Sequence, residues 1–175
     1  MGPPILALVI GINKYTSQNF PSLEGAVADA NLFEKFLKER LNVPDADIIN
    51  LRDEQASRAS IISAFASLRD HPKYEKNEAA IIIFYAGHGA QKDKPTAWQG
   101  WDTRNGRIEM LCPSDIGCPV NGKECEGVQV TVQGIPDRSI SALLNQISKV
   151  KSNNIVSVFD SSESQTLNLN CFRRL

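Results

Sequence analysis

The sequence predicts an α/β fold in which a mostly parallel sheet carries helices on both faces. Three observations indicate it: apolar runs of the kind found in buried strands, amphipathic segments between them, and their alternation along the chain. Parallel strands joined through a helix connect with a right-handed crossover, and successive crossovers can cover both faces of a sheet. The chain has 175 residues, 42% of them hydrophobic, which predicts a single domain with a real core.

The first half of the chain supplies two strand–helix units. Residues 5–12 form a continuous aliphatic run, typical of a strand buried on both faces. Residues 24–41 follow, with apolar side chains at helical spacing and charged side chains opposite them. Residues 47–51 predict a second strand, and Ser57 can then cap a helix whose apolar positions repeat as far as Leu68.

The next strand prediction is the strongest in the chain and ends at a histidine. Residues 79–85 form this strand, and we expect Gly87-His88-Gly89 to end it abruptly. A later strand at 155–159 leads into a polar loop at 160–164. Because open parallel sheets bind ligands at the carboxyl ends of their strands, these two loops are the predicted place of a functional site.

Between these two strands lies a long irregular segment. Residues 90–136 are rich in Gly, Pro, Lys and Asp and predict a hairpin with functional loops, its best strand candidates being 108–111 and 128–132. Asp137 can then cap a helix that runs to Val150.

Composition excludes two classes of partner. The 19 basic and 20 acidic residues leave a net charge of −1, so no broad positive field is available for nucleic acid. The apolar run at 3–10 lacks the basic start of a signal peptide and is too short to span a bilayer. We therefore expect no membrane partner and a cytoplasmic location. The cysteines form no C-x-x-C pair and predict reduced thiols; they are Cys112, Cys118, Cys125 and Cys171.

A histidine between two glycines suits acid–base chemistry. Glycine leaves little steric cover, so the ring of His88 can face a substrate while backbone N–H groups such as that of Gly89 approach a carbonyl oxygen. Without its context such a histidine would more often be an ordinary surface or core residue. Its position after the strongest strand favours a functional role.

Four segments, in order, carry a family resemblance. They are Ala7-Leu8-Val9-Ile10-Gly11-Ile12-Asn13, Leu23-Glu24-Gly25-Ala26-Val27-Ala28-Asp29-Ala30, Phe84-Tyr85-Ala86-Gly87-His88-Gly89 and Val158-Phe159-Asp160. Together they resemble caspase-like proteases of the metacaspase branch, across about residues 5 to 164. The resemblance implies a caspase-like three-layer sandwich.

The resemblance also implies a Cys–His dyad. Its histidine corresponds to His88, and its cysteine lies in an Asp-x-Cys-His-Ser loop that corresponds to Asp160-Ser161-Ser162-Glu163-Ser164. Ser162 thus stands at the position of the nucleophile, and we expect the chain to be inactive or nearly so because a serine hydroxyl ionises far less than a thiol. An engineered knockout, a natural pseudo-protease and a partial gene product all fit this substitution. Cys171 is a poor replacement because it follows no buried strand.

Substrate and metal expectations follow from the same resemblance. The acidic well that receives Arg or Lys in metacaspases corresponds to Asp29 and Asp160, and two carboxylates suit the planar donors of Arg. No cofactor is predicted. Calcium could bind near Glu109 and Asp115, with Asp102 as a further oxygen donor, but three carboxylates fall short of its usual ligand number.

The predicted domain covers residues 1–164, with a divergent or truncated tail at 165–175. The resemblance implies a peptide or protein substrate and a missing small-subunit portion, whose absence would leave an exposed sheet edge and allow dimerisation. The alternative function is a non-enzymatic pseudo-protease that binds peptides or proteins. A nucleotide-binding protein is disfavoured because no glycine-rich phosphate loop follows any predicted strand.

Overall fold

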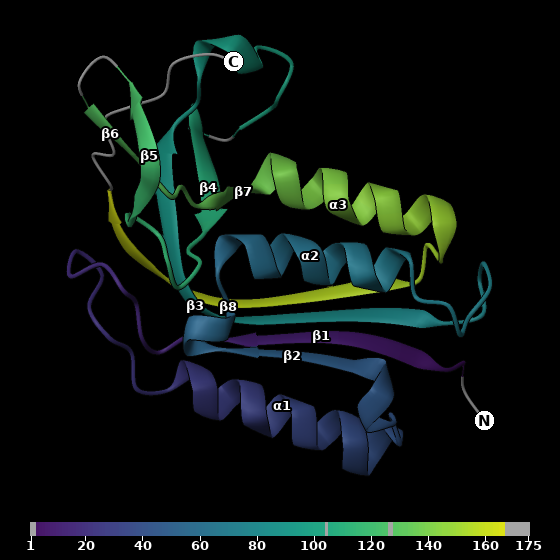
Figure 1. Ribbon diagram of the computed structural model, residues 1–175. Coiled ribbons are helices and arrows are strands. Elements are labelled where there is room, and N and C mark those ends of the chain that lie inside the picture. The colour runs from purple at the N-terminus through teal and green to yellow at the C-terminus, as the bar shows by residue number, and fades with distance from the viewer. Residues whose placement is uncertain (1–2, 104, 126–127, 167–175) are drawn as a thin grey trace.

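One mixed sheet organises the chain. The computed structural model describes residues 3–103, 105–125 and 128–166 (Figure 1). The sheet strands in this part of the chain are β1 (Ile5–Gly11), β2 (Ile48–Arg52), β3 (Ala80–Asp93), β4 (Arg107–Leu111), β7 (Ile135–Pro136) and β8 (Ile155–Thr166). Their order is β2-β1-β3-β4-β7, and β8 pairs with β3. The β1–β2, β1–β3 and β3–β8 pairs are parallel, whereas β4 pairs antiparallel with β3 and β7, so the predicted mostly parallel sheet is confirmed.

Helices cover both faces of this sheet. They are α1 (Ala26–Leu41), α2 (Arg58–Arg69) and α3 (Asp137–Val150). Figure 1 shows α1 beneath the sheet and α2 and α3 side by side above it. The arrangement is the predicted three-layer sandwich. A separate hairpin, β5 (Pro119–Cys125) with β6 (Val128–Thr131), lies in the long segment where a hairpin was expected. Of the two strands predicted there, 128–132 corresponds to β6, whereas 108–111 corresponds to β4 of the main sheet.

Alternating side chains along the central strands build two cores. On the α1 face, Val9 and Phe84 pack with Leu37, and the ring of Phe33 stacks on Phe84 with centroids 4.4 Å apart. The core on the opposite face contains side chains from β1, β3, α2 and α3, namely Leu8, Ile10, Ile83, Tyr85, Ile61, Phe65, Ile140 and Ile147. Because successive strand residues point to opposite faces, one aliphatic run serves both cores.

The predicted helix caps are partly right. Ser57 caps α2, since its Oγ accepts a hydrogen bond from the Ser60 N–H at 3.1 Å. Asp137 does not cap α3: Pro136 holds the N-cap position and Asp137 is the first helical residue. The Asp137 carboxylate instead accepts hydrogen bonds from its neighbour's N–H and from the indole N–H of Trp101, because the packed loop brings that tryptophan to the helix start.

Two strands run further than their sequence predicted. β3 does not end at Gly87-His88-Gly89 but continues to Asp93, because β4 pairs with its second half where β1 stops opposite Ala86. β8 likewise continues beyond residue 159 to Thr166 along β3. His88 therefore lies within a strand rather than in a loop.

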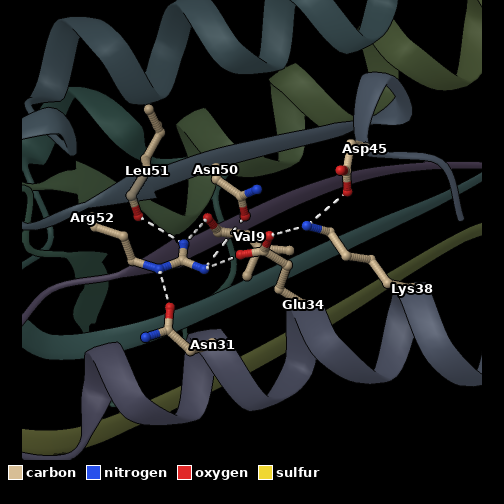
Figure 2. A network of polar contacts seen from close by, with 8 residues as sticks. All are labelled: Val9, Asn31, Glu34, Lys38, Asp45, Asn50, Leu51 and Arg52. Atoms are coloured by element: carbon tan, nitrogen blue, oxygen red, sulfur yellow. Dashed lines mark hydrogen bonds and ion pairs between the residues drawn. The ribbon is translucent and has the colours of Figure 1, made fainter.

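A polar network fastens α1 to the edge of the sheet (Figure 2). Arg52, at the end of β2, donates to the Val9 carbonyl at 2.8 Å, to Asn31 Oδ1 at 3.0 Å and to Glu34 Oε2 at 3.0 Å. Burial lowers the pKa of the guanidinium, while the nearby carboxylates of Glu34 and Asp53 oppose that shift. The Arg52 side chain thus joins β1, β2 and α1 through one planar group.

Candidate active site

The backbones of His88 and Ser162 lie next to each other in the sheet. They are register partners in the parallel β3–β8 pair, following the pairs Phe84–Val158 and Ala86–Asp160. The two strands that the sequence singled out are therefore direct neighbours. Their proximity requires no loop movement, because hydrogen bonding between the strands sets it.

The imidazole of His88 has a defined orientation. Its Nε2 lies 2.8 Å from the carbonyl oxygen of Pro21. A carbonyl can only accept a hydrogen bond, so the neutral ring must carry its proton on Nε2 and its lone pair on Nδ1. Pro21 lies in the segment between β1 and α1, and no side-chain chemistry in the sequence marks this carbonyl as a partner.

The ring is more covered than its flanking glycines predicted. His88 is only 3% exposed. Its ring lies 4.8 Å from that of Tyr15 and 6.2 Å from that of Phe20, measured between centroids. Both aromatic residues belong to the segment that contains Pro21, so this one segment both covers and orients the imidazole.

Two tyrosines hold the peptide groups around His88. The N–H of His88 donates to the Tyr15 hydroxyl at 2.7 Å, and its carbonyl accepts from the Tyr85 hydroxyl at 2.7 Å. A Cβ at Gly87 would lie 2.7 Å from the Tyr85 oxygen and 3.0 Å from that of Tyr15, so any larger residue there would force these hydroxyl groups to shift. Burial raises the pKa of both phenols, which keeps them neutral and available as hydrogen-bonding groups.

The predicted carboxylates lie on the α1 side of the sheet. Asp29 is exposed in the first turn of α1. Asp160 is exposed on β8. Its register partner Ala86 packs in the core between the sheet and α1. Gly89 pairs with Leu111 of β4 on one side and with Glu163 of β8 on the other. Four of the five predicted residues therefore come from the same two strands, and α1 adds the fifth.

A cavity of about 700 Å³ lies elsewhere, between α3, β4 and β8. It includes Phe159 and Ser161, which alternate with Asp160 and so belong to the opposite face of the sheet. Apart from Gly89, it contains none of the predicted site residues. His88 and Ser162 are thus not among the residues that line this cavity.

The calcium ligands suggested by the sequence do not converge. Asp115 Oδ1 accepts a hydrogen bond from the Arg58 N–H at 2.8 Å, at the start of α2, whereas Glu109 lines the cavity beside α3. Within residues 3–103, 105–125 and 128–166, no group of three or more His, Cys, Asp or Glu side chains could hold a metal ion. The same part of the chain contains no helix long and apolar enough to cross a membrane.

Comparison with known proteins identifies the family. Residues 5–169 match the family described as "Caspase domain". The chain belongs to this family. It is 28% identical over 113 residues to Metacaspase-3 of Arabidopsis thaliana, in a match that covers 62% of this chain and 29% of that protein. This relationship supports the metacaspase type of the caspase family.

A solved structure supports the fold. The crystal structure of protein GSU0716 from Geobacter sulfurreducens superposes with a TM-score of 0.59 at 20% identity, covering 90% of this chain and 49% of that one. At this identity the likeness concerns the fold alone. The chain thus spans about half of the compared structure and under a third of the plant metacaspase.

The chain is therefore a caspase-like domain of a cysteine peptidase family. Cys112 and Cys118 are free. Burial raises the pKa of the Cys112 thiol to about 12, so it is protonated at neutral pH and a poor nucleophile. Cys171 lies outside the described residues.

Proposed function

We propose that this caspase-like domain keeps the acid–base half of a peptidase site in His88 but holds a serine, Ser162, at the nucleophile position. Gly89, the strand neighbour of His88, belongs to the same proposed site. The single observation that carries the proposal is the β3–β8 register, which sets residue 162 opposite residue 88. The chain then hydrolyses peptide bonds slowly or not at all.

The group that orients His88 explains why a serine would be a weak nucleophile here. Serine hydrolases usually orient the histidine with a carboxylate, which also stabilises the imidazolium that forms when the hydroxyl loses its proton. The partner of His88 Nε2 is the neutral carbonyl of Pro21. A carbonyl dipole stabilises an imidazolium less than a full negative charge does, and a thiol needs less help because it ionises more readily.

The proposed substrate carries Arg or Lys before the bond that a competent relative would cleave. Asp29 and Asp160 support this specificity, since both carboxylates are exposed and both lie on the α1 side of the sheet. Two carboxylates would complement one guanidinium through paired charge-assisted hydrogen bonds. An acidic peptide would meet like charge at the same place.

A second function is favoured by the edge of the sheet. In the described part of the chain β8 pairs with β3 alone, and exposed apolar side chains line it: Val156 is 52% exposed, Val158 38% and Phe159 43%. Exposed strand edges invite pairing with another chain. The domain would then act as a non-enzymatic binding module, in which a small-subunit portion or a second copy of this chain pairs along β8.

Restoring the nucleophile tests the first function. We expect the natural chain to cleave neither an Arg peptide nor its Glu counterpart, and the variant Ser162→Cys with Glu163→His to cleave the Arg peptide. Adding His88→Ala to that variant should abolish the cleavage. Absence of cleavage in a folded restored variant, with retained binding of the Arg peptide, would favour the binding module.

Association is tested separately by light scattering during size exclusion. A dimer that becomes a monomer on Val158→Lys supports pairing along β8, because the new charge would be buried against the partner. A monomer of the natural chain at every concentration would count against this pairing.

A further inference from the structure

We propose that Asp53 is a positioning residue for His88, acting through the segment of residues 12–25 to hold the imidazole in its Nε2-protonated form. Only the catalytic importance of the Nε2-protonated imidazole rests on the proposed function. The contacts themselves connect the end of β2 to the histidine, one step at a time.

The first step joins Asp53 to the chain after β1. One carboxylate oxygen of Asp53, Oδ1, accepts hydrogen bonds from the backbone N–H groups of Asn13 at 2.8 Å and Lys14 at 2.9 Å. Asp53 adopts a φ of 44°, in the left-handed region that a residue with a side chain rarely occupies. This conformation costs free energy. In it, the Asp53 carboxylate accepts two charge-assisted hydrogen bonds from the segment that covers His88.

The second step closes that segment at its base. The carbonyl oxygen of Asn13 accepts from the Leu23 N–H at 2.8 Å. The Asn13 side chain donates to the Glu24 carbonyl at 3.3 Å and accepts from the Val27 N–H at 3.1 Å, in the first turn of α1. Asn13 therefore binds both ends of the segment together, and Asp53 holds the backbone of Asn13.

The third step reaches the imidazole. The closed segment presents the Pro21 carbonyl to Nε2 of His88 and the Tyr15 hydroxyl to its backbone N–H. A second anchor, the hydrogen bond from the Thr16 N–H to the Ser114 carbonyl at 2.9 Å, holds the Tyr15 side of the segment. Loss of the Asp53 contact should therefore displace Pro21 more than Tyr15, and so affect the ring more than the backbone of His88.

The carboxylate itself stands on a rigid support. Its neighbour Arg52 is fixed to Val9, Asn31 and Glu34 by the network of Figure 2. Asp53 thus holds the segment of residues 12–25 at a fixed place relative to the edge of the sheet. No residue in this path other than His88 needs to touch a substrate.

The tautomer of His88 tests the proposal without any catalysis. The chain contains two histidines, so nitrogen-15 chemical shifts of the imidazoles resolve His88 from His71, which stacks on Tyr74 and serves as an internal control. Asp53→Gly removes the carboxylate and accommodates the positive φ. We expect the ratio of Nε2-protonated to Nδ1-protonated His88 to fall about fivefold in this variant, as for the loss of one neutral hydrogen bond. Asp53→Asn keeps an oxygen acceptor and should retain the natural ratio, and His71 should change in neither variant.

Asn13→Ala provides an independent test, because it opens the base of the segment and leaves Asp53 in place. It should lower the same ratio. An unchanged His88 ratio in Asp53→Gly or in Asn13→Ala, with cooperative thermal unfolding retained, overturns the proposal. Since the readout requires no turnover, a failed attempt to restore peptidase activity would leave this result separate and interpretable.

Discussion

The carbonyl oxygen of Pro21 lies 2.8 Å from Nε2 of His88, and this contact dictates which ring nitrogen carries the proton. The partner is a backbone atom of the segment between β1 and α1. In the sequence, α1, β2 and α2 separate this segment from β3, which contains the histidine. The tautomer of His88 therefore depends on how that segment is held.

Replacing Gly87 by alanine should destabilise the domain. The new Cβ would approach the Tyr85 oxygen to 2.7 Å and the Tyr15 oxygen to 3.0 Å. Overpacking of this kind costs about 1–3 kcal/mol of unfolding free energy. Urea unfolding measures the loss, and Gly100→Ala is the matched control because its Cβ would meet nothing within 4 Å.

A double-mutant cycle attributes this cost to the phenol. Combining Gly87→Ala with Tyr85→Phe removes the nearest oxygen, so the combined loss should be smaller than the sum of the two single losses. Strict additivity would contradict the steric role of the Tyr85 hydroxyl.

Gly11→Ala should be more damaging than Gly87→Ala. Its Cβ would lie 2.6 Å from the Cβ of Ala30 and 2.8 Å from the Ala26 carbonyl, so α1 would have to move away from β1. Hydroxyl groups can shift, but a helix backbone fastened by the Arg52 network cannot do so cheaply. The expected result is a lower urea midpoint than for Gly87→Ala, and equal midpoints would contradict it.

Asp47 should contribute stability that disappears in acid. Burial acts to raise the pKa of its carboxyl, but hydrogen bonds from Lys73 and Tyr74 outweigh burial and hold the pKa below its ordinary value. A depressed pKa in the folded state stabilises the fold above the unfolded pKa of about 3.9, and the gain is lost as the pH falls through the folded pKa.

The measurement compares urea unfolding of the natural chain and Asp47→Asn from pH 7 to pH 3. We expect a difference of about 1.5–3 kcal/mol at pH 7, as for hydrogen bonds to a charged group, that shrinks below about pH 4. Asp45→Asn is the control, because that side chain is 81% exposed and its ion pair with Lys38 should contribute little. A difference that is constant with pH would show that the carboxylate charge is not responsible.

Thiol labelling should separate two cysteines. Cys112 is buried with a pKa raised to about 12, whereas Cys118 is partly exposed. Alkylation at pH 8 followed by peptide mapping should modify Cys118 in the folded chain and Cys112 only after denaturation. Rapid labelling of native Cys112 would show that the core around it, which includes Phe20, Ile108 and Ile116, opens readily.

The predicted elements were largely right because their signals are local. The aliphatic run that predicts β1 and the apolar spacing that predicts α2 each depend on neighbouring residues only. Ser57 was correctly predicted as the N-cap of α2. β3 and β8 were predicted too short, since their extensions pair through strands that lie far away in the sequence. Glycines normally weaken a strand, but here β4 and β8 both support the Gly87–Gly89 stretch.

Only part of the candidate site could be predicted from the sequence. His88 and Asp160 stand at motif positions and could be chosen from the sequence. Pro21 could not, because any residue has a carbonyl and only the closed segment directs this one. Asp53 lies in an ordinary polar stretch, and the two N–H groups that it accepts from become apparent only when β1 and β2 lie side by side.

The amino-acid sequence alone determined the layered α/β fold and the identities of His88 and Ser162, because both periodicity and residue identity can be read directly along the chain. Tertiary structure decided the tautomer of His88, its burial and its supports. These depend on hydrogen bonds between backbone groups of distant segments, and such groups are identical in every residue until the fold brings two of them together.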